Sequence, residues 1–286
     1  MTLSPTGHLP PLVEREPRSS ADLFKQLCRL GHFHGTVEAT EAEQLGFEDP
    51  KAESAVASYQ DWHGLKVDGD LGPVTAAHLS RPRCGLADVL PARGCTPKWS
   101  FLDVTFSHRL TFDTLSADGI QRAVDTALGQ WNAVCGIRLK FQQALTTANI
   151  WAEARAIDRS GGTLAWSYMP ECGSPASTRI QQRYDTREQW AFDFLVAVMT
   201  HELGHALGLD HTNVPNNLMN PFYDERITKP QSTWDIPQAM LRYGKPDQAT
   251  PPVPAPMPPD PESGEATVLI NVGGKNYAGT AVLAER

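Results

Sequence analysis

The sequence predicts an α+β domain preceded by a small all-α module. Residues 21–79 carry apolar side chains at helical spacing, whereas residues 99–245 mix short β-type segments with a few helical ones. The length of 286 residues also suits two domains, because a domain averages about 150 residues. Hydrophobic residues make up 41% of the chain, which is enough to bury a core.

The charge balance and the hydropathy exclude several classes of protein. Acidic residues outnumber basic ones by 33 to 25, which gives a formal net charge of −8 and no basic face for nucleic acid or an anionic membrane. The longest apolar run, Phe194–Met199, is far shorter than the roughly 18 residues of a membrane span. We therefore expect neither a nucleic-acid partner nor a membrane partner, and we expect a monomer.

The N-terminal part is expected to combine a disordered start with a helical module. Residues 1–20 are rich in Pro and Ser and show no basic segment followed by an apolar one, so no secretory signal is visible. Helical spacing runs over residues 21–30 and 52–60, and Pro73 suits the first position of a further short helix. The segment 81–88 is expected to be irregular.

An exposed linker at residues 89–98 leads into the second domain. Its expected strands are residues 104–106, 137–141, 148–152, 163–168 and 179–184, and its expected helices are residues 117–134, 187–207 and 234–243. Residues 246–264 are proline-rich and predict a stiff linker. Residues 265–286 form a tail with one expected hairpin, Thr267–Val272 with Thr280–Leu283, around Gly273 and Gly274.

The cysteine count is odd, so at least one thiol is unpaired within a monomer. The five cysteines are Cys28, Cys84, Cys95, Cys135 and Cys172. Their spacing leaves the pairing open.

The residues that carry chemistry begin with two histidines four positions apart. His201 and His205 project from one face of a helix, the separation that two imidazoles need to reach one Zn²⁺ at about 2.0–2.1 Å. Glu202 is turned about 100° from His201, so it is placed to take a proton from water rather than to ligate. Gly208 can turn the chain through a positive φ and bring His211 back as a third ligand, leaving one metal position open. The alternative is a helix with ordinary buried or solvated histidines.

A methionine follows the third histidine, in the segment Asn217-Leu-Met-Asn-Pro-Phe-Tyr223. Together with the histidine motif, this segment resembles the matrixin branch of the metzincins, the matrix-metalloproteinase-like zinc endopeptidases. The resemblance implies a metzincin catalytic domain over residues 99–245, with a twisted mixed sheet and long helices. It also implies that Met219 lies beneath the zinc.

The same resemblance implies where a substrate peptide binds. Pro221 and Tyr223 would form one wall of the pocket for the residue after the scissile bond. The peptide would lie extended along the edge strand that contains Leu164 and Ala165.

The upstream segment Pro82-Arg-Cys-Gly-Leu-Ala-Asp88 resembles the cysteine switch of the family, with Ala87 in place of the usual proline. A Cys84 thiolate would occupy the open zinc position and keep the protease latent, while Arg83 and Asp88 would hold the segment through an ion pair. The alternative is a free or disulfide-bonded Cys84. Residues 21–88 resemble a peptidoglycan-binding-like prodomain, which cleavage in the activation linker 89–98 would release. By resemblance the protein is secreted.

Two further metal sites of the family were compared with this sequence. The ligand positions of the structural zinc fall on Trp151, Glu153, Trp166 and Arg183. None is histidine, so we predict no structural zinc, with tryptophan packing in its place. A Ca²⁺ site would use the carboxylates of Asp158, Asp185 and Glu188. The alternative is solvated turn carboxylates, with Asp185 or Thr186 capping the next helix.

These observations predict a latent zinc endopeptidase with Zn²⁺ and Ca²⁺ as cofactors and with proteins or peptides as substrates. One alternative is a cell-wall-associated hydrolase whose N-terminal module binds peptidoglycan. Another is a non-enzymatic binding protein with a structural metal. The presence of Glu202, and the lack of a fourth ligand other than Cys84, argue against that second alternative.

Overall fold

The computed structural model describes residues 20–33, 50–246, 265–272 and 275–282. The chain divides after Pro246 into two units, and each is described by itself. Within these residues no helix combines the length and the apolar character needed to cross a membrane. The expected disordered start (1–20) and proline-rich linker (246–264) lie almost entirely outside the described residues.

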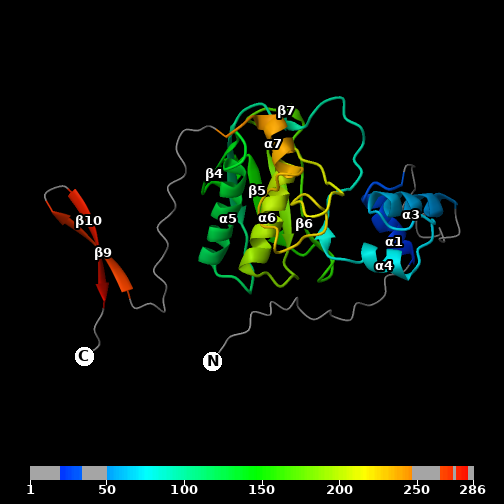
Figure 1. Cartoon of the computed structure of the whole chain (residues 1–286), viewed down its shortest axis with the longest axis horizontal. Helices are drawn as coiled ribbons and strands as arrows, with labels where there is room; N and C mark the ends of the chain where they lie inside the picture. Colours follow the sequence, from blue (N-terminus) through cyan, green and yellow to red (C-terminus); the bar gives the residue numbers. More distant parts are fainter. Residues whose placement is uncertain (1–19, 34–49, 247–264, 273–274, 283–286) are drawn as a thin grey trace. The chain divides into compact units, whose positions relative to one another are not determined.

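The N-terminal module consists of helices, as predicted. Its described helices are α1 (Ser20–Arg29), α3 (Pro50–Trp62) and α4 (Pro73–Leu79) (Figure 1). Pro73 stands at the start of α4, where the missing N–H costs no hydrogen bond. The helices bury a small core of their own, formed by Leu23, Phe24, Leu27, Leu30, Ala52, Ala55, Val56, Tyr59 and Leu79. The apolar positions that predicted the helices are therefore the ones that hold them together.

The second domain is built on a mixed sheet of six described strands, which confirms the α+β class. In spatial order the strands are β1 (Arg83–Cys84), β6 (Thr163–Ser167), β8 (Ile180–Asp185), β5 (Ile150–Arg155), β3 (Asp103–Arg109) and β4 (Arg138–Phe141). Strand β3 pairs parallel with β4 and β5, and β5 pairs parallel with β8. Strand β6 runs antiparallel to β8 and carries β1 on its other edge. The six-stranded sheet thus ends on a strand contributed by residues 83–84.

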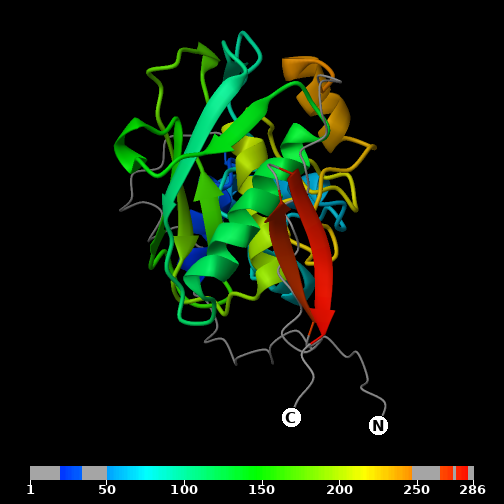
Figure 2. The same cartoon turned by 90° about the vertical axis from the view of Figure 1, so that its left-hand side faces the viewer.

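Two long helices pack together over this sheet (Figure 2). Helix α5 (Ala117–Asn132) begins at Ser116, whose hydroxyl accepts the N–H of Gly119 at 3.1 Å. Helix α6 (Phe192–Ala206) is apolar nearly all round and is buried along almost its whole length. The indole of Trp131 on α5 donates to the carbonyl of Thr200 on α6 at 2.8 Å. Helix α6 packs against α5 and β6 and is buried along most of its length. The side chains that it carries are therefore held in fixed positions.

The long helix begins five residues later than the sequence predicted. Residues 186–191 turn instead, because the Asp185 carboxylate accepts the N–H of Arg187 at 2.9 Å and the Trp190 indole donates to the Asp185 carbonyl at 2.8 Å. The residue before α6 is Ala191, which makes no side-chain cap. The expectation that Asp185 or Thr186 caps this helix was therefore wrong.

Three short strands and a disulfide were not predicted. The segment 81–88, expected to be irregular, contains β1, and β2 (Lys98–Trp99) pairs parallel with β7 (Cys172–Ser174). Cys95 is disulfide-bonded to Cys172, while Cys28, Cys84 and Cys135 are free. Strands of two or three residues, like a disulfide, depend on partners far along the chain, so local sequence patterns do not predict them.

The last elements are a helix and a hairpin. Helix α7 (Asp235–Tyr243) lies where the sequence predicted it. In the second unit, β9 (Glu265–Val272) pairs antiparallel with β10 (Lys275–Val282), so the second strand begins five residues earlier than expected.

Candidate metal centre

Three histidines meet at the end of α6. His201 and His205 lie one turn apart on the helix and are fully buried. Just beyond it, Gly208 has a φ of +88°, and a Cβ there would lie 2.2 Å from the Pro97 carbonyl oxygen, so only glycine fits. The turn brings His211 back to the helix. The Nε2 atoms are 3.0 Å apart for His201 and His205, 3.1 Å for His205 and His211, and 3.3 Å for His201 and His211.

The other ring nitrogens reveal the tautomers of these histidines. The Nδ1 contacts are His201 to the Leu218 carbonyl at 2.6 Å, His205 to the Leu209 carbonyl at 2.7 Å and His211 to Asp88 Oδ1 at 3.2 Å. The carbonyl partners of His201 and His205 are acceptors, so the proton of these two rings is assigned to Nδ1 and the lone pair to Nε2. The Nδ1 of His211 lies at ion-pair distance from Asp88 but makes no hydrogen bond among the described residues. Lone pairs on Nε2 atoms about 3 Å apart repel one another unless a cation lies among them. This donor set therefore fits Zn²⁺ with three imidazole ligands.

Burial keeps these rings neutral. It holds the pKa of His201 and of His205 well below the ordinary value for histidine, and the neighbouring imidazole of His211 acts in the same direction. Neutral imidazole is the form that ligates a metal. The burial and the geometry of the three rings thus both favour the binding of a metal ion.

The loop after the histidines is fixed from below. A Cβ at Gly204 would lie 2.3 Å from the Sδ of Met219, so the methionine packs directly against the helix that carries the first two histidines. Met219 is fully buried. The buried carboxylate of Asp235 accepts the backbone N–H groups of Leu218 and Met219 at 2.8 and 3.1 Å. The Leu218 carbonyl that orients His201 is therefore held in place by Asp235.

Glu202 is buried beside the histidines and is held by one oxygen. The hydroxyl of Tyr223 donates a hydrogen bond to its Oε1. Its Oε2 is buried and has no hydrogen-bond partner within the described part of the chain. Burial raises the pKa of Glu202 to about 7, although Tyr223 and Cys84 act to lower it. Tyr223 was expected to line a pocket for substrate, and in the structure its hydroxyl points at this carboxylate.

A segment from the N-terminal side of the chain closes this centre. The Sγ of Cys84 lies 3.5 Å from the Nε2 of His205 and is fully buried. Burial raises the pKa of the Cys84 thiol well above its ordinary value, and the nearby Glu202 carboxylate adds to the rise. A bound divalent cation would act in the opposite direction, because a coordinating thiol loses its proton.

The main chain around Cys84 lies where a substrate peptide was expected. Arg83 pairs with Thr163 and Cys84 with Ala165 in parallel register, so β1 lies along the edge strand that also contains Leu164. The N–H of Cys84 donates to the Pro221 carbonyl at 2.9 Å, on the opposite side of the segment. The predicted substrate-binding residues are thus brought together, with β1 between them.

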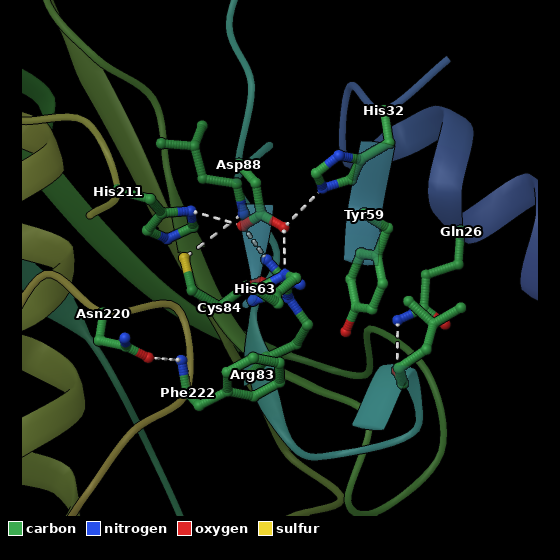
Figure 3. A network of polar contacts seen from close by, with 12 residues as sticks. Gln26, His32, Tyr59, His63, Arg83, Cys84, Asp88, His211, Asn220 and Phe222 are labelled. Carbon is green, nitrogen blue, oxygen red and sulfur yellow. Dashed lines mark hydrogen bonds and ion pairs between the residues drawn. The ribbon is translucent and has the colours of Figure 1, made fainter. Parts of the chain in front are cut away.

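Asp88 links the N-terminal module to the metal centre (Figure 3). Its Oδ2 lies 3.2 Å from the Nε2 atoms of His32 and His63, and its Oδ1 pairs with the guanidinium of Arg83 and lies beside His211. Although burial acts to raise it, Arg83 and the three histidines hold the pKa of Asp88 well below its ordinary value. The predicted pairing of Arg83 with Asp88 is present, and two histidines of the helical module join it.

The nitrogen and oxygen atoms of His32, His63 and Asp88 are close enough together to resemble a second metal site. We interpret them as a hydrogen-bonded anchor. The carboxylate already pairs with the Arg83 guanidinium, whose positive charge disfavours a second cation beside it. The Nδ1 of His32 also lies 3.2 Å from the Ser58 hydroxyl, which orients the ring.

The three carboxylates predicted for calcium lie around one loop but bind main-chain amides. Asp158 accepts the N–H of Thr163 at 3.0 Å, Asp185 accepts that of Asp158 at 3.1 Å, and Glu188 accepts that of Gly161 at 2.5 Å. Burial raises the pKa of Glu188, and the charges of Asp185 and Asp158 add to the rise. Among the described residues their oxygen atoms do not converge as the histidine nitrogens do.

The positions that correspond to a structural zinc hold an ion-paired cluster. Glu153 pairs with Arg109, Arg155 and Arg183. The guanidinium of Arg183 lies 5.1 Å from the centre of the Trp166 ring. Tryptophan packing was expected here, and the structure adds the charged pairs around Glu153 to it.

Sequence reasoning missed several residues of this centre. His32 and His63 lie far apart along a helical module, and only the folded chain brings them to Asp88. Asp235 follows Trp234 at the start of α7, and an aspartate at a helix start suggests an ordinary cap. Nothing in its local pattern indicates that it holds the loop at Met219.

Comparisons with known proteins match both parts of the chain. Residues 98–239 match the family model described as "Matrixin", and residues 21–79 match one described as "Putative peptidoglycan binding domain". Macrophage metalloelastase of Oryctolagus cuniculus is 31% identical over 86% of this chain and 55% of its own length. Matrix metalloproteinase-15 of Homo sapiens is 31% identical over 72% of this chain and 36% of its own length. The chain therefore spans about half or less of the length of these relatives.

Proposed function

Because this chain belongs to the matrixin family of zinc metalloendopeptidases, we propose that it cleaves internal peptide bonds of proteins and that its own N-terminal module keeps it latent. The observation that carries the proposal is the position of Cys84, whose sulfur faces the three histidines while its main chain lies along β6. We assign residues 21–88 to the inhibitory module, 89–98 to the activation linker and 99–245 to the catalytic domain.

Once β1 has left the metal centre, the proposed peptide hydrolysis uses the three histidines, Glu202 and Tyr223. His201, His205 and His211 would hold Zn²⁺, which would supply Lewis-acid polarisation of the scissile carbonyl and a lowered pKa of water. The Oε2 of Glu202 is the oxygen left without a partner, so it accepts the proton of the attacking water. Glu202 then returns that proton to the leaving amine. Tyr223 holds the other oxygen and so orients the carboxylate.

The substrate would take the place that β1 occupies. Once the inhibitory segment leaves, the backbone groups of Gly162 and Ala165 that now bind Arg83 and Gly85 become free to pair with an extended peptide. The Pro221 carbonyl would accept an N–H from the opposite side. This edge recognises main chain, so it suits protein substrates of varied sequence.

Location and partners follow from the same proposal. A disulfide persists in oxidising compartments, so Cys95–Cys172 supports an extracellular location. Contact of the helical module with peptidoglycan, and the monomeric state, stay predictions.

Removal of the metal should abolish proteolysis reversibly. The purified and processed chain is expected to contain one zinc per molecule, to lose hydrolysis of a peptide library in a strong chelator, and to regain it with added zinc. Metal analysis by mass spectrometry and a fluorogenic peptide assay measure the two properties side by side. Hydrolysis that persists in metal-depleted protein would contradict a zinc peptidase.

Calcium is a separate prediction. A site with a Kd of about 10⁻⁴ M would stabilise the chain by about 2.7 kcal/mol in about 10 mM calcium. Thermal unfolding should therefore shift to higher temperature on calcium titration, and Glu188→Gln should reduce the shift. An unfolding temperature unchanged at millimolar calcium would reject the site.

Acid should lower the folding stability of the chain through His63. Burial lowers the pKa of His63 to about 4, despite the nearby Asp88, with Arg83, His32 and His78 also facing it. Between about pH 6.5 and 4 the unfolded chain binds a proton that the folded chain does not, so folding stability falls as pH falls through that window, by about 3 kcal/mol at most. Below about pH 4 both states bind it and this contribution stays constant.

The measurement is the unfolding temperature of the full chain from pH 7 to pH 4. His63→Gln should show a shallower dependence on pH than the wild type, while the exposed Lys98→Gln should match the wild type. Equal slopes for His63→Gln and the wild type would show that His63 does not contribute.

A further inference from the structure

The linker between the inhibitory module and the catalytic domain is held at both ends and open between them. Asp88 and Val89 donate their N–H groups to the Leu30 carbonyl at 2.9 and 3.2 Å. The next main-chain hydrogen bond between described residues is that of Lys98, to the Glu171 carbonyl at 3.2 Å. Residues 91–96 are exposed, and they border a cavity of about 470 Å³. A protease can lift this backbone away without breaking a main-chain hydrogen bond.

Arg93 is the one basic residue between Val89 and Pro97. Its side chain is exposed, and among the described residues its guanidinium makes a weak contact with the Met169 sulfur at 3.8 Å. Gly94 follows, with no atom within 4 Å of the place where a Cβ would lie. Both sides of the Arg93–Gly94 bond are therefore accessible to a protease that cuts after a basic residue.

The disulfide divides the linker into two parts. Cys95 is bonded to Cys172 of β7, which forms a separate two-stranded sheet with β2. Everything from Cys95 onward therefore stays attached to the catalytic domain whatever happens upstream. A cut before Cys95 separates the inhibitory module, whereas a cut after Cys95 leaves the module joined through the two sulfur atoms.

We propose that the activating cut falls at the Arg93–Gly94 bond, and that the Cys95–Cys172 disulfide makes any cut beyond Cys95 unproductive. This inference rests on the proposed latency. The step is a hydrolysis: water adds across the amide, leaving a carboxylate on Arg93 and an ammonium group on Gly94. The disulfide is unchanged, so no oxidant or reductant takes part.

The two products differ in how the module rebinds the catalytic domain. After a cut before Cys95 rebinding is bimolecular, whereas after a cut beyond Cys95 it is intramolecular. A module tethered by a short segment has an effective concentration of the order of millimolar, so it rebinds its own catalytic domain at any dilution. A module cut before Cys95 is diluted with the protein. At about 10 nM protein the ratio of these concentrations is about 10⁵, so the two products should differ clearly in activity.

Two full-length variants test this. Arg93→Gln alters one exposed side chain, and we expect it to resist activation by a trypsin-like protease at least tenfold. Any cleavage of this variant beyond Cys95 should yield fragments that separate only after reduction. The second variant combines Arg93→Gln with Thr96→Arg and Pro97→Ala, which moves the basic residue beyond Cys95 and removes the proline that would block the cut.

The wild type, once cut, should run as two fragments on a non-reducing gel, and its activity per molecule should rise on dilution. The relocated variant should run as one species without reductant and as two with it. Its activity should stay near that of the uncut chain at every dilution and rise at least tenfold after phosphine reduction.

Equal activity of both cut proteins with the disulfide intact would overturn the inference while leaving latency standing. Resistance of the wild-type Arg93–Gly94 bond, with activation arising elsewhere, would also overturn it. An uncut wild type as active as the cut one would instead refute latency itself, so the two failures are distinguishable. If the relocated variant does not fold, the cut and gel pattern of Arg93→Gln still decide the question.

Discussion

Replacement of Glu202 by glutamine should lower kcat/KM of the processed enzyme by about 10²–10⁴ while leaving its zinc content unchanged. The amide keeps the size of the side chain and its contact with Tyr223 but cannot accept a proton. The imidazoles that hold the metal are unaffected, because Glu202 lies off the face that His201 and His205 share.

The matched control is Glu225→Gln. Glu225 is an exposed carboxylate in the loop just after Tyr223, so its loss removes the same charge near the site without touching the reacting atoms. It should change kcat/KM by less than about twofold. Full proteolysis by Glu202→Gln, measured with a fluorogenic peptide and confirmed metal content, would exclude the proton transfer assigned to this residue.

Replacement of Cys84 by serine should make the uncut chain active. A hydroxyl is a much poorer zinc ligand than a thiolate, so the module loses the contact that competes with water and substrate. A tenfold rise in the activity of the unprocessed chain corresponds to about 1.4 kcal/mol of lost inhibition, and we expect at least that. The rise should stay below the activity of the cut enzyme, since Cys84 also donates its main-chain N–H to Pro221.

Cys28→Ser serves as the control, because Cys28 is a free cysteine of the same module that lies away from the metal centre. The Cys28→Ser substitution should leave the uncut chain proteolytically inactive. A silent Cys84→Ser chain that becomes active only when cut would show that the paired main chain of β1, and not the thiol, maintains latency. Assays of uncut protein require a reducing gel in parallel to exclude adventitious cleavage, because the Cys95–Cys172 disulfide would conceal a cut beyond Cys95 on a non-reducing gel.

Much of the centre follows from spacing along the chain. The interval from His201 to His205, the intervening Glu202 and the turn at Gly208 all depend on helix geometry over a few residues, and a local pattern determines them. The same holds for the apolar faces of α1 and α5, which predicted both helices. The start of α6 was placed wrongly, because Asp185 directs its hydrogen bonds to a turn that propensity alone does not distinguish from a cap.

The sequence alone therefore predicted the fold class and proposed His201, His205, His211 and Glu202 as the site, since these depend on patterns over neighbouring residues, while the resemblance of residues 82–88 to a known segment proposed Cys84. Tertiary structure decided the anchoring of Asp88 by His32 and His63, the pairing of β1 with β6 and the partner of Cys95. These contacts join residues far apart along the chain. The entropy cost of closing the long loops between these residues is offset only when the whole chain has packed, so no local sequence pattern predicts these contacts.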